Sequence, residues 1–163
     1  MPVTLSGSCH CGAVKFTVDS STPVPYQLCC CSICRKVGGY VGAVNLGAHS
    51  DTLKIQGKEH ISVYKAIMNR GEKDEHEANS ERNFCSKCSA MLWLYDSEWP
   101  ELLHPFASAI DSPELEAPGE MVCLMTASKP SYFRLPEGKK VVVEEYPELS
   151  LADWHKKHGK YVK

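Results

Sequence analysis

The cysteines impose the strongest constraint on how this chain can fold. Eight of the nine fall in three short groups far apart in the sequence: Cys9-x-Cys11, the stretch CCCSIC at 29–34, and Cys85-x-x-Cys88. A tetrahedral zinc–thiolate site has Zn–S distances near ~2.3 Å, which holds its sulfurs within about 4 Å of one another. Each pair supplies half of such a site. Two pairs together would give a closed, structural zinc site that ties the N-terminal segment to the chain near residue 86.

The 29–34 stretch predicts a second site with fewer ligands. Cys29 and Cys31 lie two residues apart and share one face of an extended chain, and Cys31-x-x-Cys34 is the spacing of a turn that curls around an ion. Cys30 lies between two of these ligands and is expected to point the other way. Three cysteines remain, and a zinc ion with three protein ligands keeps a position for water or substrate, as catalytic zinc sites do.

Two alternatives stay open on spacing alone. The 29–34 cysteines can instead pair with the second C-x-x-C pair, which leaves the C-x-C pair without a role. A distant histidine, His104 or His49, can also fill the fourth position of the three-cysteine site and make it structural.

The other candidate ligands have simpler interpretations. Cys123 lies between Val122 and Leu124 in an apolar stretch, where a lone cysteine behaves as a small hydrophobic residue. Cys30 is expected to be a packed or solvent-facing thiol. His10 is flanked by two ligands and should face outward because side chains alternate along an extended chain.

Cysteine number and charge exclude several classes of protein. Nine is an odd number, and the start MPVTLS has neither the basic nor the apolar segment of a secretory signal, so we expect a reducing compartment, the cytoplasm or alternatively the nucleus, without stable disulfides. The net charge of −2 gives no reason to expect nucleic acid or an anionic membrane as partner. No apolar run approaches the ~20 residues of a membrane span. A chain of 163 residues suits a single domain, residues 1–163.

The apolar pattern predicts a mainly β chain. Val14, Phe16 and Val18 alternate with polar residues, as in a half-buried strand. Further strands are expected at 40–46, 90–96 and 120–127, with a short edge strand at 139–145. The segments 52–57 and 60–66 resemble a hairpin that turns near Gly57.

Two other stretches are expected to differ from this pattern. The charged segment 69–82 has almost no apolar side chain and is expected to be a solvated loop. Only the tail looks helical, because Ser150-x-x-Asp153 is similar to a capping box and Gly159 follows a last turn rich in Lys and His. Leu151 and Trp154 would form its buried face.

Four motifs in order resemble those of one known family. They are GSCHCGAVKF at 7–16, CCCSICRKVGG at 29–39, RNFCSKCSAML at 82–92 and ASAIDSPE at 107–114. Together they resemble the glutathione-dependent formaldehyde-activating enzyme family, which also includes centromere protein V, and the tail is similar to that of fungal members. This chain departs from the family pattern at Cys30, where the family usually has His, and at Ser89-Ala90, where it usually has Gly-Thr or Gly-Ser.

The resemblance implies a fold, an activity and two sets of ligands. The implied fold is a β-tent of antiparallel sheets, similar to small Rab exchange factors, and here followed by a short C-terminal helix. The implied activity is that of a zinc-dependent carbon–sulfur lyase acting on S-hydroxymethylglutathione, the adduct of glutathione and formaldehyde. Two zinc ions (Zn2+) per chain are implied. By position, the structural zinc ligands are Cys9, Cys11, Cys85 and Cys88, and the catalytic zinc ligands are Cys29, Cys31 and Cys34.

Charge suggests which residues contact such a substrate. Glutathione is anionic, and Arg35 and Lys36 directly follow Cys34, so they are candidates to contact the thiol substrate. A site with three thiolates has blunted Lewis acidity, which favours capture of a substrate thiol over activation of water. The competing interpretation is a non-catalytic zinc-binding module for protein interaction, as the Rab-exchange and centromere relatives suggest.

Overall fold

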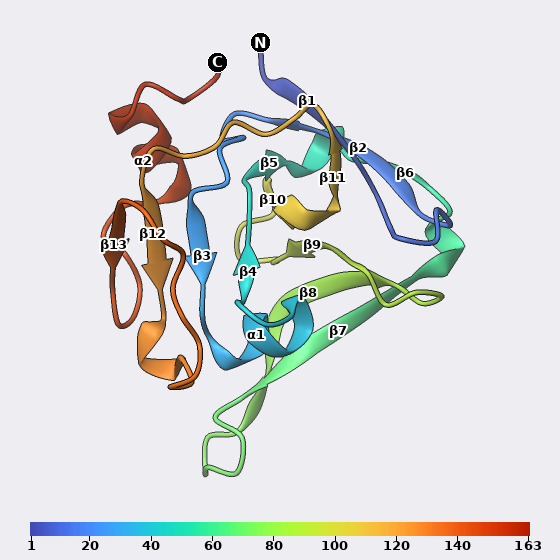
Figure 1. Cartoon of the computed structure of the whole chain (residues 1–163). Coiled ribbons are helices and arrows are strands. Elements are labelled where there is room, and N and C mark those ends of the chain that lie inside the picture. Colours follow the sequence, from blue (N-terminus) through green and yellow to red (C-terminus); the bar gives the residue numbers. More distant parts are fainter.

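Three β-sheets and two short helices make up the fold (Figure 1). The computed structural model describes residues 1–163. The predicted mainly β class is confirmed. No helix is both long and apolar enough to cross a bilayer.

The first sheet is antiparallel and has the order β11-β1-β2-β6. Its strands are β1 (Val3–Ser8), β2 (Lys15–Ser20), β6 (Lys54–Gln56) and β11 (Ile110–Ser112). The predicted alternation is present in β2, where Phe16 and Val18 are buried and Lys15 is exposed.

The second sheet is also antiparallel and has the order β5-β10-β9-β8-β7. Its strands are β5 (Ala48–His49), β7 (Ile61–Met68), β8 (His76–Cys85), β9 (Met91–Tyr95) and β10 (Leu102–Pro105). Strand β9 confirms the prediction for 90–96. The first two sheets meet in the main core, where the rings of Phe16 and Trp93 pack edge to face with centroids 5.1 Å apart.

The third sheet has the order β13-β12-β3-β4 and is mixed. Its strands are β3 (Gln27–Cys29), β4 (Ala43–Val44), β12 (Met121–Leu124) and β13 (Lys140–Val142). Strands β12 and β13 confirm the strands expected in 120–127 and 139–145, whereas only two residues of 40–46 are in a strand. Strand β12 runs parallel to both β3 and β13, so the expectation of antiparallel sheets holds for two sheets of the three.

The predicted hairpin around Gly57 is wrong. Gly57 does adopt the left-handed backbone conformation of a turn, with φ 77°. However, β6 pairs with β2 and β7 pairs with β8, so the two segments belong to different sheets. The short 3-10 turn Lys58–His60 redirects the chain from one sheet to the next instead of folding it back on itself.

The predicted loop at 69–82 is correct only in its first half. Residues 69–75 form the turn, and β8 begins at His76 and continues to Cys85. Strands β7 and β8 extend as a long ribbon that ends in this turn (Figure 1). His76 and Glu77 are exposed at its outer end, so this part of the strand needs no apolar alternation.

One helix was not predicted and the other was. Helix α1 (Ser32–Gly38) begins after Cys31, whose sulfur accepts a hydrogen bond from the backbone N–H of Cys34 at 3.3 Å. Cysteine is not among the usual N-cap residues, which explains the missed helix. Helix α2 (Leu151–Lys157) begins as expected at Ser150, whose Oγ accepts from the backbone N–H of Asp153 at 3.1 Å.

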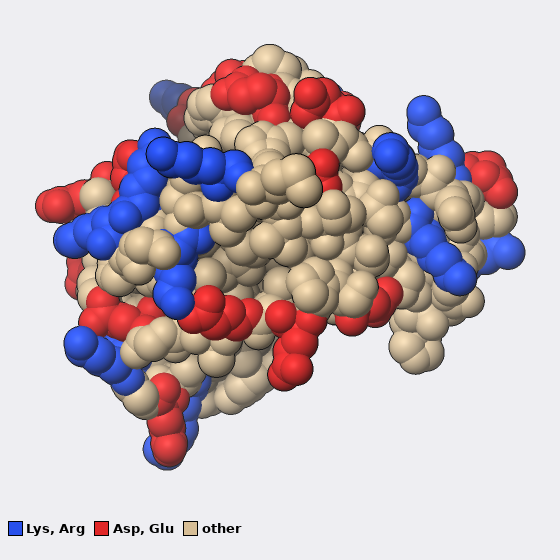
Figure 2. All heavy atoms as spheres, turned by 90° about the horizontal axis from the view of Figure 1, so that it is seen from above, with Lys and Arg blue, Asp and Glu red and all other residues tan.

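The charged side chains do not gather by sign on the face seen in Figure 2. Lys and Arg lie among Asp and Glu there, around a broad area without charge. This face therefore presents mixed charge rather than a single-signed field.

Candidate metal centres

Four cysteines from two distant turns meet at one point. They come from the segment between β1 and β2 and from the end of β8 with its following turn, and they are Cys9, Cys11, Cys85 and Cys88. All four sulfurs lie within 4.8 Å of one another, with Cys11 3.6 Å from Cys9 and 3.8 Å from Cys85. A tetrahedron of sulfurs around zinc has edges of about 3.8 Å. The donor set and its spacing therefore fit a four-thiolate metal site.

Backbone hydrogen bonds shape both turns around these sulfurs. The N–H of Val14 donates to Sγ of Cys9 at 3.2 Å. In the second turn the N–H of Ser89 donates to the carbonyl of Cys85 at 2.8 Å. Ser89 has φ 63°, a left-handed conformation that favours glycine. This conformation explains why a glycine suits the position after Cys88, where this chain has Ser89.

Three further cysteines form a second group at the end of β3 and the start of α1. The sulfurs of Cys29, Cys31 and Cys34 also lie within 4.8 Å of one another. Cys34 is buried with 4% of its surface exposed, whereas Cys29 and Cys31 are half-buried, so one side of the group reaches solvent. All nine cysteines are free thiols. The structure thus groups these seven cysteines as four and three, and the 29–34 cysteines do not meet the second C-x-x-C pair.

No histidine completes the three-cysteine group. Neither His104 nor His49 belongs to it. Nδ1 of His104 faces the carbonyl of Leu46 at 3.2 Å, and Nε2 of His49 lies 2.9 Å from the hydroxyl of Ser21. The alternative in which one of them supplies a fourth ligand is therefore not found in this structure, because backbone and hydroxyl partners hold both rings elsewhere.

The three thiols share their protons unequally. Hydrogen bonds from the thiols of Cys29 and Cys34 lower the pKa of Cys31 to about 2. The same contact with Cys31 raises the pKa of Cys29. This arrangement favours the thiolate form of Cys31, which suits the group to bind a positive ion.

A buried arginine that the sequence did not reveal contacts this group. Arg82 of β8 is 6% exposed, and its Nη2 lies 3.7 Å from Sγ of Cys34. Its Nε is buried without a hydrogen-bond partner. Arg82 begins the RNFC motif, but only the three-dimensional structure, in which β8 lies against α1, shows that it approaches a cysteine 48 positions away. Three residues later the same strand supplies Cys85 to the four-cysteine group.

Arg35, Lys36 and Tyr146 differ in their burial around the three-cysteine group. Arg35 is half-buried in α1 with its Nε buried and unpartnered, while the neighbouring Lys36 is exposed. Tyr146 follows β13 and is exposed, and desolvation together with the nearby thiols of the group raises the pKa of its phenol.

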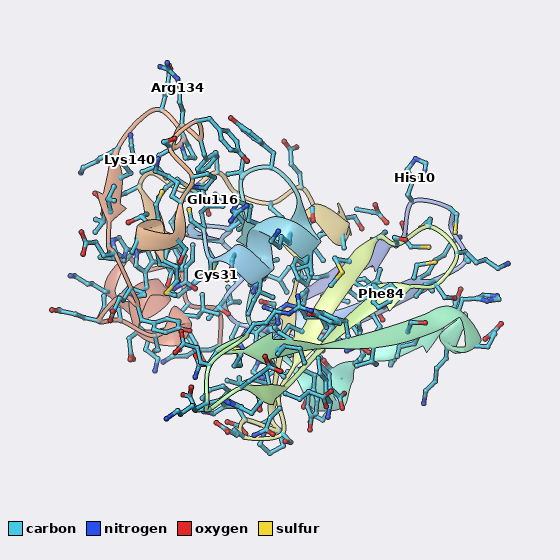
Figure 3. The ribbon with its side chains drawn as sticks, turned by 90° about the horizontal axis from the view of Figure 1, so that it is seen from below. His10, Cys31, Phe84, Glu116, Arg134 and Lys140 are labelled. Carbon is cyan, nitrogen blue, oxygen red and sulfur yellow. The ribbon has the colours of Figure 1, made fainter.

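The residues expected to have no metal role are placed as predicted. Cys30 is buried, and packs with Cys123 and Phe133 in a small separate core. His10 is exposed and points away from the molecule, at the far end of the view from Cys31 (Figure 3).

A mainly β fold with two cysteine-rich groups defines a class of small proteins with two candidate metal centres. Within this class, the chain belongs to the glutathione-dependent formaldehyde-activating enzyme family, whose sequence model matches residues 4–127. All seven grouped cysteines and Arg82 lie inside this match. Tyr146 and α2 lie outside it.

Two known proteins are similar to this chain. A Halomonas elongata protein named after the same family is 47% identical over 157 residues, which cover 95% of this chain and 96% of the relative. The crystal structure of a Rhodobacter sphaeroides protein has a TM-score of 0.52 and 22% identity, and covers 67% of this chain and 90% of its own. The second comparison concerns the fold alone.

Proposed function

We propose that the protein is a zinc-dependent carbon–sulfur lyase that acts on the adduct of glutathione, or another thiol, with an aldehyde. S-hydroxymethylglutathione, the formaldehyde adduct, is the first candidate. Cys29, Cys31 and Cys34 would hold the catalytic zinc, and the four-cysteine group would hold a structural zinc. The observation that carries the proposal is the unequal division of the thiols, with three in a group that reaches solvent beside a buried cation.

The donor set of each group fits zinc. Thiolates are soft ligands that select zinc among the divalent ions available in a reducing compartment such as the cytoplasm. Four thiolates complete a tetrahedral shell, whereas three leave one position for a substrate atom. A zinc ion bound by the three thiolates would supply the positive charge that stabilises the sulfur of the substrate as a thiolate.

Residues of the chain would provide the remaining electrostatic support. In the cleavage direction the adduct hydroxyl would give its proton to solvent water, the O–H electron pair would form the carbonyl, and the electron pair of the C–S bond would go to sulfur. Negative charge therefore accumulates on sulfur. The guanidinium of Arg82, next to Cys34, would offset part of this charge. Arg35 and Lys36, on the helix that carries Cys34, would attract the carboxylates of glutathione.

The decisive experiment combines metal analysis and turnover on one purified sample. We expect two zinc ions per chain and reversible consumption of formaldehyde with glutathione, followed by proton NMR. Two zinc ions with turnover only on other thiol–aldehyde adducts would change the substrate but keep the class. A single zinc ion, held by the four-cysteine group, would contradict the proposal.

One observation favours a second candidate, a non-catalytic module for protein interaction. Tyr40 and Tyr132 are exposed by 61% and 65%, and their rings lie 6.1 Å apart. Exposed aromatic side chains are common at protein interfaces. Two zinc ions without turnover on any thiol–aldehyde adduct, together with loss of a partner in a Tyr40→Ser variant, would favour this candidate over the enzyme.

A further inference from the structure

A cavity of about 470 Å³ lies between the second sheet and the C-terminal segment. We call it the C-terminal cavity. Its walls come from β5, β10 and the turn before β10 on one side, and from α2 and Tyr161 on the other. Ser21 and Thr22 also line it. The wall formed by α2 and Tyr161 lies outside the part of the chain that matches the family, so the cavity is not built from the family motifs alone.

The wall formed by α2 is firmly attached to the rest of the fold. The buried ring of His155 accepts a hydrogen bond from the N–H of Val24 at 3.1 Å, and Trp154 stacks on Tyr26 with ring centroids 3.7 Å apart. Beyond the helix, the N–H of Val162 donates to the carbonyl of Ser21 at 3.0 Å. The cavity is therefore formed before any ligand binds.

The chemistry of the lining excludes charged ligands. None of the twelve lining residues is Lys, Arg, Asp or Glu. A carboxylate placed there would lose water without gaining a cation, which is costly. Glutathione carries two carboxylates and is therefore a poor fit. The cavity also contains no cysteine, so it is separate from both candidate metal centres.

Among the polar side chains that line the cavity, His104 offers a hydrogen-bond acceptor. Nδ1 of His104 faces the carbonyl of Leu46, and because a carbonyl only accepts, Nδ1 carries the proton. Nε2 is then a hydrogen-bond acceptor on a ring that lines the cavity. Burial lowers the pKa of His104, which keeps this ring neutral at pH 7. Trp99, which is 53% exposed, adds a flat aromatic surface.

We propose that the C-terminal cavity binds a neutral aromatic alcohol, whose hydroxyl donates to Nε2 of His104 while its ring packs against Trp99 and Leu151. This site goes beyond the proposed lyase function and does not depend on it. In the second sheet Arg82 pairs with Leu94 and Leu94 with His104, so Arg82 and His104 lie on one face, two strand spacings or about 10 Å apart. A ligand in the cavity thus lies near the three-cysteine group without touching it.

The test uses 2-naphthol, a fluorescent aromatic alcohol, with the purified full chain and its bound metal. We expect saturable binding of one 2-naphthol per chain at pH 7, measured by naphthol fluorescence and by calorimetry. The anion 2-naphthoate should bind about tenfold more weakly or less, because its carboxylate has no cation. His104→Phe should weaken naphthol binding about 3- to 10-fold, because it removes the acceptor.

Matched variants of α2 locate the binding. Ala152→Phe adds a large side chain to the cavity wall and should abolish binding, whereas Lys157→Phe adds the same side chain at an exposed position of the same helix and should not. Absence of saturable binding, or equal binding by wild type and Ala152→Phe, overturns the proposal. A wild-type dimer that Ala152→Phe converts to a monomer overturns it as well, because the cavity would then be a protein interface.

Discussion

The two cysteine groups differ in ligand number and local charge, and they do not differ simply in burial. The four-cysteine group includes Cys11, which is exposed, yet it has a full set of four thiols and is held by backbone N–H groups. The three-cysteine group has no exposed member, yet it lacks a fourth ligand and has Arg82 at its buried side. The exposure of single cysteines therefore does not separate the proposed catalytic group from the proposed structural one. Ligand number and the neighbouring cation do separate them.

Removing one thiol from each group should give the largest difference between the two groups, in stability for one and in turnover for the other. We expect Cys88→Ser to lower the free energy of unfolding by at least about 5 kcal/mol, because a structural zinc contributes directly to folding and small domains have little reserve. Cys31→Ser should keep the fold and lose turnover. Circular dichroism, thermal unfolding and zinc content of both variants check this. If Cys31→Ser unfolds as fully as Cys88→Ser, both sites are structural.

Removing the buried cation should have the next largest effect. We expect Arg82→Met to reduce kcat/KM about 10- to 100-fold, equivalent to about 1.4–2.8 kcal/mol, because charge on the substrate sulfur loses its counter-ion. Arg82→Lys keeps the charge and should retain more activity than Arg82→Met. Zinc content should remain at two per chain in both variants. Equal activity of Arg82→Met and wild type would show that the cation has no role in the reaction.

The stability of the protein should fall in mild acid, in part because of the buried His155. Burial lowers the pKa of His155 below its ordinary value of 6.5, so the folded state binds this proton less readily than the unfolded state. Its contribution to stability is complete above pH 6.5 and is lost as pH falls below 6.5 towards the folded-state pKa, at up to about 1.4 kcal/mol per pH unit. Chemical denaturation between pH 7.5 and 5.5 measures this slope.

The variant His155→Gln isolates the contribution of His155 to the pH dependence of stability. It should remove the part of the slope that belongs to His155 and leave any part that belongs to His104 or to the grouped cysteines. An unchanged slope in His155→Gln would assign all of the acid sensitivity to other groups.

The smallest expected effect concerns the turn of the four-cysteine group. Ser89→Gly should raise the free energy of unfolding by about 0.5–1 kcal/mol, because it relieves a left-handed conformation at φ 63°. Turnover should be unchanged. Lys87→Gly is the control, because Lys87 lies in the same turn and has no positive φ. This variant should have a lower free energy of unfolding than the wild type. Destabilisation by Ser89→Gly would show that the turn carries no strain.

Spacing predicted which cysteines share one turn, because it is a local property, whereas the union of the C-x-C pair with the distant C-x-x-C pair was implied by the family resemblance. A C-x-C or C-x-x-C segment brings its own sulfurs together whatever the rest of the chain does. Arg82 could not be predicted, because its contact with Cys34 depends on how β8 lies against α1. The outer half of β8 was missed for a related reason. A strand in a ribbon with both faces in solvent has no buried face to pattern.

The incorrectly predicted hairpin near Gly57 shows that the sequence did not reveal which strands pair with each other. The residues near Gly57 signal a turn correctly, but a turn does not specify whether the next strand returns to the same sheet. That choice is made by the strands already present, β2 for one segment and β8 for the other. The tail helix could be predicted because its capping residues lie within four positions of each other.

Strand β8 restricts where related sequences can carry insertions or deletions. Arg82 contacts the three-cysteine group and Cys85 belongs to the four-cysteine group, yet only two residues separate them, so an insertion or deletion between them would move at least one of the two out of place. Substitutions at Phe84 leave this spacing intact. The turn at 69–75 carries neither group and can lengthen or shorten freely. Evolutionary variation in length should therefore accumulate at the tip of the ribbon and be absent from its base.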